Sequence, residues 1–96
     1  MASASVRFES GDYEWLAERN GVLFLGQTAL GMVEFLITAE ALAEFADPDL
    51  DGIDSETALE TFAEFEPDIH RIALREFVSR LGGEPPVLLT AADVSA

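Results

Sequence analysis

Two short segments in the first half of the chain, residues 22–27 and 32–37, are apolar at most positions. Four residues that end in a glycine separate them, so together they predict an antiparallel hairpin. A sheet with one face in water alternates apolar and polar residues along each strand, and this hairpin does not. Both of its faces are therefore expected to need cover.

One small domain has enough helices to cover one face of such a hairpin well. The opposite face carries Leu23 and Leu25 from the first strand and Met32 and Leu36 from the second. We expect this face to meet a second copy of the chain, because symmetric self-contacts are the commonest way in which a protein covers such a surface. The pattern therefore predicts a homodimer with these four residues in its interface.

Three amphipathic helices are expected after the hairpin. The first spans residues 39–46 behind an N-cap at Thr38. The second begins after a cap at Asp54 or Ser55, and the third runs over about residues 67–81. A proline at the start of the third helix separates the two, because the residue before a proline avoids helical torsions.

Short strands are expected at residues 6–8 and 87–90. The signals of residues 10–21 conflict: they favour either a short helix or a strand that turns at an asparagine-glycine pair, and we expect an irregular or short extended segment. A flexible tail is expected at residues 1–5 and one domain at residues 6–96, since a chain of 96 residues supports a single modest core.

These elements predict the α+β class. The expected architecture is a small antiparallel sheet, made of the hairpin and short edge strands, with two to three helices packed on one face. The hydrophobic fraction of 49% is that of a folded protein and lies far from the disordered regime.

The charge of the chain excludes several classes of partner. Nineteen carboxylates accompany only five basic residues, all arginines, for a formal net charge of -14. Such a surface repels phosphate backbones and anionic membranes, so we expect neither nucleic acid nor membrane as a partner. A salt-rich cytoplasm, a GC-rich genome and a basic protein partner are three alternative explanations of the acidity.

The residue types that the sequence lacks exclude further chemistry. Without cysteine there are no disulfides, thiolate metal sites or cysteine nucleophiles. Without lysine there is neither a lysine Schiff base nor the phosphate-binding Gly-Lys motif. The sequence shows no export signal and no apolar run of bilayer length, so we expect a cytoplasmic protein, and we expect no cofactor.

An acidic loop is the candidate for a metal site. Asp47, Asp49 and Asp51, followed by Gly52, match the first half of a calcium-binding loop. Such a loop also needs a bidentate glutamate at its twelfth position, where this chain has Ala58. A solvated acidic turn between two helices is therefore the favoured interpretation, and a weak calcium site is the alternative.

His70 is the only histidine of the chain. A zinc site needs three or four ligands, and only carboxylates are available to join this imidazole. Glu66 lies one helical turn before it, with Pro67 between them. We therefore expect a partly exposed histidine on a helix and no metal ligand.

Arg71 and Arg75, with Arg80 nearby, form the only cationic cluster. The simplest interpretation is local pairing along the helix, for example between Asp68 and Arg71 at i, i+3 spacing. A sharper interpretation places Arg71 and Arg75 against a ladder of glutamates on the preceding helix, within the fold or across a dimer. Both arginines are therefore candidate interface residues. The ladder consists of Glu56, Glu60 and Glu64.

A series of short strings gives the chain a recognisable signature. They are V-R-F near the start, Trp15, V-L-F at Val22 to Phe24, Gly31-Met32-Val33, I-T-A-E-A-L at Ile37 to Leu42, A-L-E-T-F at Ala58 to Phe62, D-I-H-R-I-A at Asp68 to Ala73, and L-L-T-A-A-D-V at Leu88 to Val94. In order and spacing they resemble a family of uncharacterised proteobacterial proteins, the domain of unknown function fourteen eighty-eight. The resemblance implies a compact, self-associating α+β domain of bacterial origin, and it implies no activity and no catalytic residues.

The sequence thus favours a small non-enzymatic domain that acts through protein contacts. We expect it to form a homodimer, and an unidentified protein partner is a further possibility. A weak calcium-responsive module is the first alternative. An unrecognised enzyme built on carboxylates is the second, since nineteen acidic side chains always offer some pair at acid-base distance.

Overall fold

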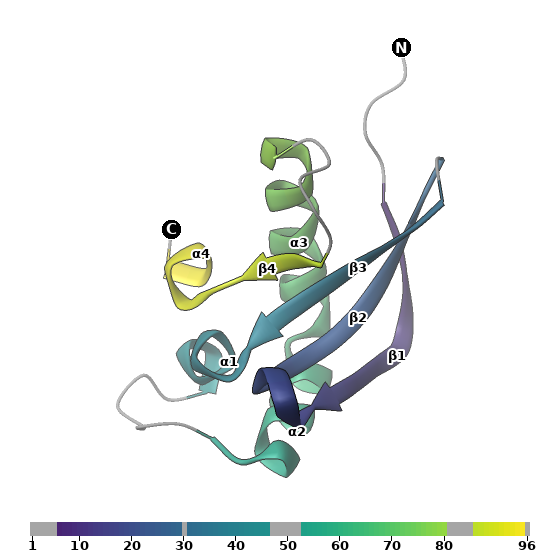
Figure 1. The fold of residues 1–96 in the computed structure, drawn as a ribbon. Helices are drawn as coiled ribbons and strands as arrows, with labels where there is room; N and C mark the ends of the chain where they lie inside the picture. Colours follow the sequence, from purple (N-terminus) through teal and green to yellow (C-terminus); the bar gives the residue numbers. More distant parts are fainter. Residues whose placement is uncertain (1–5, 30, 47–52, 81–85, 96) are drawn as a thin grey trace.

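The computed structural model describes residues 6–29, 31–46, 53–80 and 86–95, and all structural statements below concern these residues. Their strands form one mixed sheet in the order β1-β2-β3-β4. The first three are antiparallel neighbours, and β4 runs parallel to β3 (Figure 1). The strands are β1 (Arg7–Leu16), β2 (Gly21–Thr28), β3 (Gly31–Thr38) and β4 (Val87–Leu89).

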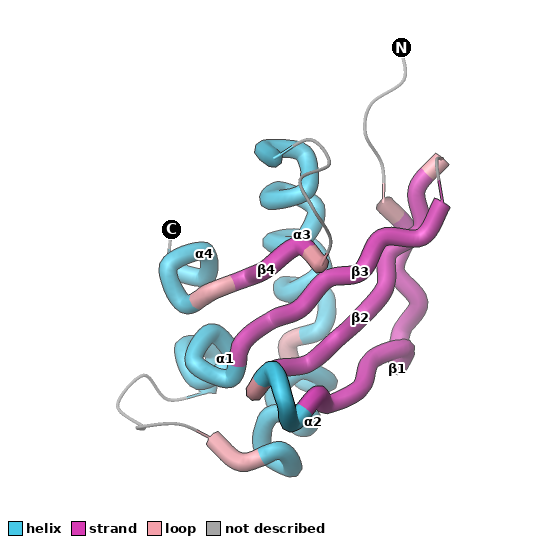
Figure 2. The backbone as a smooth tube through the Cα atoms, viewed as in Figure 1, coloured by secondary structure: helices cyan, strands magenta, loops and turns pink. Residues whose placement is uncertain are grey.

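Five helical segments accompany the sheet, one of them a single 3-10 turn. They are η1 (Ala17–Arg19), α1 (Ala39–Ala46), α2 (Ser55–Glu64), α3 (Glu66–Arg80) and α4 (Ala91–Ser95). Helices α2 and α3 lie on one face of the sheet, and α1 and α4 lie beside the ends of β3 and β4 (Figures 1 and 2). No described α-helix crosses the opposite face of the sheet (Figure 2).

The α+β class is confirmed, but the sheet is mixed rather than wholly antiparallel, because β4 pairs parallel with β3. Local signals account for most element boundaries. Thr38 Oγ1 accepts a hydrogen bond from the Ala41 backbone N–H at 3.1 Å, as an N-cap of α1 does. Asp54 Oδ1 accepts one from the Thr57 N–H at 2.7 Å and caps α2. The proline expected near the start of the third helix is the second residue of α3, where its missing N–H costs nothing.

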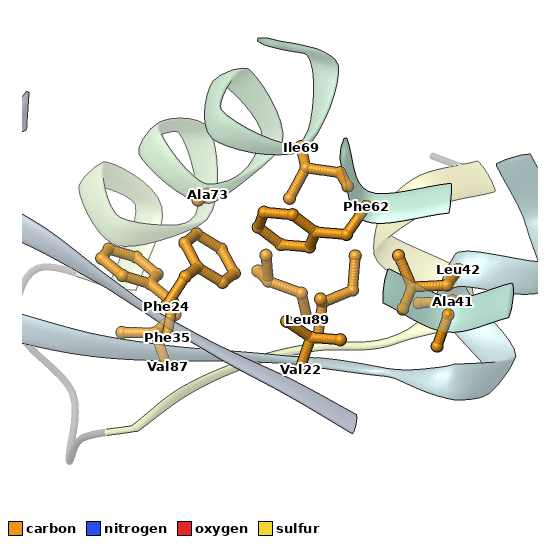
Figure 3. Close-up of a cluster of buried hydrophobic side chains, with 12 residues drawn as sticks. Val22, Phe24, Phe35, Ala41, Leu42, Phe62, Ile69, Ala73, Val87 and Leu89 are labelled. Atoms are coloured by element: carbon orange, nitrogen blue, oxygen red, sulfur yellow. The ribbon is translucent and has the colours of Figure 1, made fainter. Parts of the chain in front are cut away.

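The core lies between the sheet and helices α2 and α3 (Figure 3). Three fully buried rings form its centre: the Phe24 ring centroid lies 5.3 Å from that of Phe35 and 5.1 Å from that of Phe62. Ile69 and Ala73 of α3 close over them. The remaining cluster members come from the strands and from helices α1 and α2: Val22, Ile37, Ala41, Leu42, Ala58, Val87 and Leu89.

Strand β1 is longer than expected and is interrupted. Its pairing with β2 moves from Phe8 opposite Gly26 to Tyr13 opposite Phe24, so residues 9–12 bulge where β2 has one residue, Leu25. The irregular or short extended segment expected over residues 10–21 is therefore extended as far as Leu16 and then turns through η1 to Asn20, close to the alternative of a strand that turns at an asparagine-glycine pair. The strand resumes after the bulge because Tyr13 and the residues that follow pair with β2 again.

Candidate interaction surface

The sheet face turned away from α2 and α3 carries five leucines, which we call the leucine face. Val22, Phe24 and Phe35 point into the core, and successive residues of a strand point to opposite faces. Their strand neighbours therefore point away from the helices. Leu36 lies at the centre of this face, paired with Leu23 on one side and Leu88 on the other. The leucine face consists of Leu16, Leu23, Leu25, Leu36 and Leu88.

These leucines differ in how much of each side chain water reaches. Leu36 is 1% exposed between its paired neighbours Leu23 and Leu88, and its Cδ1 lies 3.3 Å from the position that a Cβ at Gly21 would take. Leu88 is 38% exposed, and Met32, on the same side of the sheet, is 56% exposed. The structure thus brings together the four apolar interface candidates of the hairpin, but Leu36 is already covered by its neighbours.

Charged residues lie at the margin of the leucine face. Arg7 pairs with Gln27 in the register of β1 and β2, and Glu14 pairs with Leu23. Glu34 pairs with Leu25 on the other side of β2. All three charged side chains are exposed and point to the same side as the leucines. None of the three forms an ion pair with another residue that the structure describes.

The bulge of β1 leaves an open hollow of about 330 Å³ beside Leu25. Carboxylates from the bulged strand and leucines from β2 line it together. The lining residues are Asp12, Tyr13, Glu14, Leu23, Phe24 and Leu25. The hollow therefore combines acidic and apolar side chains at its wall.

Arg71 and Arg75 lie on α3, across the sheet from the leucine face (Figure 1). Arg71 pairs with Asp68 at i, i+3 spacing, as the local interpretation expects. Arg75 donates from Nε to Glu76 at 3.1 Å and also to the Asp93 backbone carbonyl. Within one copy the two arginines therefore contact these partners and not the glutamate ladder of α2. The two arginines therefore do not share a surface with the leucines, since the whole sheet separates them.

His70 is a partly exposed histidine on a helix, as the sequence predicts, and it packs against an aromatic ring. Its ring stacks on Phe8 with centroids 4.3 Å apart and planes 11° apart, and its side chain is 19% exposed. Its Nε2 lies 3.8 Å from Glu66 Oε2, because Pro67 sits inside the first turn of α3 and does not break it. Burial lowers the pKa of His70 below its usual range, and the nearby Glu66 opposes this shift.

Metal binding finds no support in the described part of the chain, where no three His, Asp or Glu side chains come close enough to share an ion. The calcium candidates Asp47, Asp49 and Asp51 lie outside the described residues. Among the residues that the structure describes, no helix is both long enough and apolar enough to cross a membrane.

Comparisons with known proteins agree on the kind of domain. A family model with the description "Protein of unknown function (DUF1488)" matches residues 6–82. The fold is similar to the crystal structure of a protein of unknown function from this family in Shewanella loihica PV-4, with a TM-score of 0.70 and 19% sequence identity over 94% of each chain. At this identity the likeness is one of fold alone. None of the curated proteins matches the chain.

Proposed function

The chain belongs to the DUF1488 family, whose function is unknown, and we propose that it is a non-enzymatic, self-associating protein-interaction domain. The leucine face is the proposed contact surface, and the cytoplasm is its proposed compartment. One observation carries the proposal: five leucines gather on a sheet face that no described α-helix covers (Figure 2).

Covering this face is favourable because apolar area removed from water contributes about 25 cal/mol per Å². Contiguous apolar patches on a protein surface mark contact sites, whereas single exposed hydrophobic residues do not. Leu16, Leu23 and Leu25 are half-buried and Leu88 is exposed, so all four have area left to lose. Two sheets that pack face to face lie about 10 Å apart with interdigitated side chains, which is the geometry that such a face suits.

A second copy of the same chain fits the charges of this face. The net charge of -14 opposes association of two copies, yet exposed carboxylates such as Glu56, Glu60 and Glu64 lie on α2, behind the sheet. The leucine face itself carries both signs, with Arg7 near one end and Glu14 near the other. A surface with both signs is able to complement itself in a symmetric dimer.

Glu66 is buried and His70 is half-buried, and the surroundings of both residues argue against catalysis. The His70 ring packs against Phe8 and within 5.9 Å of the Phe24 centroid, so it forms part of the core wall. Glu66 accepts a hydrogen bond from the Gly11 N–H. A catalytic pair needs access to a substrate, and this pair lies beneath the sheet. We therefore propose a structural role for both residues.

Light scattering and sedimentation test the proposal over a range of protein concentrations. The wild-type protein should form dimers, and Leu25→Glu and Leu88→Glu should shift the equilibrium to monomers while the circular dichroism spectrum is retained. Val78→Glu is the matched control, because Val78 is 42% exposed on α3, away from the leucine face. A wild-type chain that is monomeric at every concentration would overturn the proposal, as would equal weakening by all three substitutions.

A further inference from the structure

We infer that two copies pack leucine face against leucine face about a two-fold axis that runs across the strands at Leu25, so that Arg7 of each copy faces Glu14 of the other. This inference rests on the proposed self-association and adds its geometry. It follows from the register of the sheet, which places charged and apolar residues at equal distances on either side of Leu25.

The two charged residues are related through their partners on β2. Arg7 pairs with Gln27 and Glu14 pairs with Leu23, and these two partners lie four residues apart on the same side of β2. At about 3.3 Å per residue, the two rows are about 13 Å apart along the strand. Leu25 lies midway between the rows. Both charged residues belong to β1, so they also share one position across the sheet.

A two-fold axis that lies in the interface and crosses the strands has a simple effect. It reverses the strand direction and places each strand over the equivalent strand of the other copy. An axis at Leu25 therefore exchanges the row of Arg7 with the row of Glu14, and each dimer gains two Arg7–Glu14 pairs. Packed sheets cross at about 30°, and the long arginine side chain spans the resulting displacement.

The same axis gives a partner to Met32, the most exposed large apolar side chain of the described residues. Met32 pairs with Gln27 and Leu36 pairs with Leu23, so these two residues of β3 also lie in rows equally distant from Leu25. Met32 of one copy then lies over the row of Leu36 and covers its exposed neighbour Leu88 in the other. An axis parallel to the strands would instead bring the charges of β1 over apolar residues of β3, where a charge loses hydration without a partner.

One like-charge contact accompanies this arrangement. Glu34 pairs with Leu25 and thus lies in the row of the axis, so the two copies of Glu34 approach each other. Strand β4 pairs only with Phe35, Leu36 and Ile37, which leaves space beside Glu34 for its side chain to turn outward. The geometry therefore gives two glutamates of one face opposite effects on dimer formation: Glu14 supports association and Glu34 opposes it.

Charge reversal tests the pairing through the dissociation constant of the dimer. Arg7→Glu and Glu14→Arg should each raise it about tenfold, since two attractive pairs become repulsive, and the double variant should restore it. Glu60→Arg on α2 is the matched control, because it makes the same change in net charge as Glu14→Arg and should not weaken the dimer. Glu34→Gln should lower the dissociation constant.

Cross-linking provides a second readout, since the chain has no cysteine of its own. Leu25→Cys should cross-link efficiently with a short bis-maleimide, because both copies of residue 25 lie at the axis. Leu16→Cys should not, because its two copies lie at opposite ends of the dimer. A dimer that Leu25→Glu disrupts, but in which the two reversals add without compensation, would overturn this geometry and leave self-association standing. A wild-type monomer would overturn both.

Discussion

The Gly11 backbone N–H donates a hydrogen bond of 2.9 Å to Glu66 Oε2, across 55 positions of the chain. The bond joins the bulge of β1 to the first residue of α3. Gly11 has a φ of +83°, a left-handed conformation that suits glycine, and this turns its N–H toward the helix. The bond thus holds the bulged strand against the helical layer, and the hollow beside Leu25 depends on that bulge.

Substitutions of Glu66 should separate the role of its carboxylate as a hydrogen-bond acceptor from the role of its charge. Glu66→Ala removes the acceptor of this part-buried hydrogen bond and should lower the free energy of unfolding by about 0.5–1.5 kcal/mol, because Gly11 is exposed and water can replace part of the bond. Glu66→Gln keeps a carbonyl oxygen and should lose less. Urea denaturation measures both, and amide hydrogen exchange at Gly11 should accelerate in the alanine variant. Equal stability of the two variants with unchanged exchange at Gly11 would contradict this role.

His70 should make the protein less stable as the solution becomes mildly acidic. Burial lowers its pKa in the folded state, so the unfolded chain, with a value near 6.5, takes up a proton first. Stability should therefore fall as the pH drops below about 6.5 toward the lower folded pKa. Glu66, the charged group beside the ring, reduces this loss but does not reverse it.

The variant His70→Phe isolates this effect, because phenylalanine keeps the stack on Phe8 and does not titrate. Thermal melting of both proteins at a series of pH values should show a smaller decrease for the variant between neutral pH and pH values just below 6.5. Parallel curves through this range would show that His70 does not titrate differently in the two states.

A side chain at Gly21 would collide with the backbone of the neighbouring strand. A Cβ there would lie 2.6 Å from the Ile37 carbonyl oxygen, and this backbone atom is held within the pairing of β2 and β3. Gly21→Ala should therefore destabilise the fold by about 1–3 kcal/mol through overpacking. Denaturant unfolding measures the loss, and Ala29→Ser in the exposed hairpin turn is the control. An unchanged midpoint for Gly21→Ala would refute the contact.

The cap of α2 should depend on pH in a defined direction. Asp54 accepts a hydrogen bond from the Thr57 N–H, and this bond lowers the pKa of the carboxyl below 3.8. The stabilisation is therefore present above pH 3.8 and is lost as the pH falls through the folded pKa. Asp54→Ala should lower the melting temperature at neutral pH, and Asp54→Asn should largely restore it. The difference between wild type and Asp54→Ala should shrink in strong acid, and a difference that persists there would contradict this cap.

Local signals in the sequence determine most of the secondary structure. Thr38 and Asp54 cap the helices that they were expected to cap, because a side-chain oxygen next to the first free N–H groups acts over three residues. Apolar residues at alternate and intervening positions of the hairpin also predict apolar side chains on both sheet faces, and the structure places such side chains there. Periodicity is sufficient for these features because it depends only on neighbours along the chain.

The tertiary structure decides the features that depend on contacts between distant residues. The Gly11–Glu66 bond and the resumed pairing of β1 turn an ambiguous segment into a long bulged strand. Arg75 contacts the Asp93 carbonyl of α4 rather than the glutamates of α2, which the sharper interpretation of the sequence placed against it. Alternation along two strands places leucines on a common face, but only strand order and register show how far apart its charges lie. That spacing depends on hydrogen bonds between strands, which no single segment of the sequence encodes.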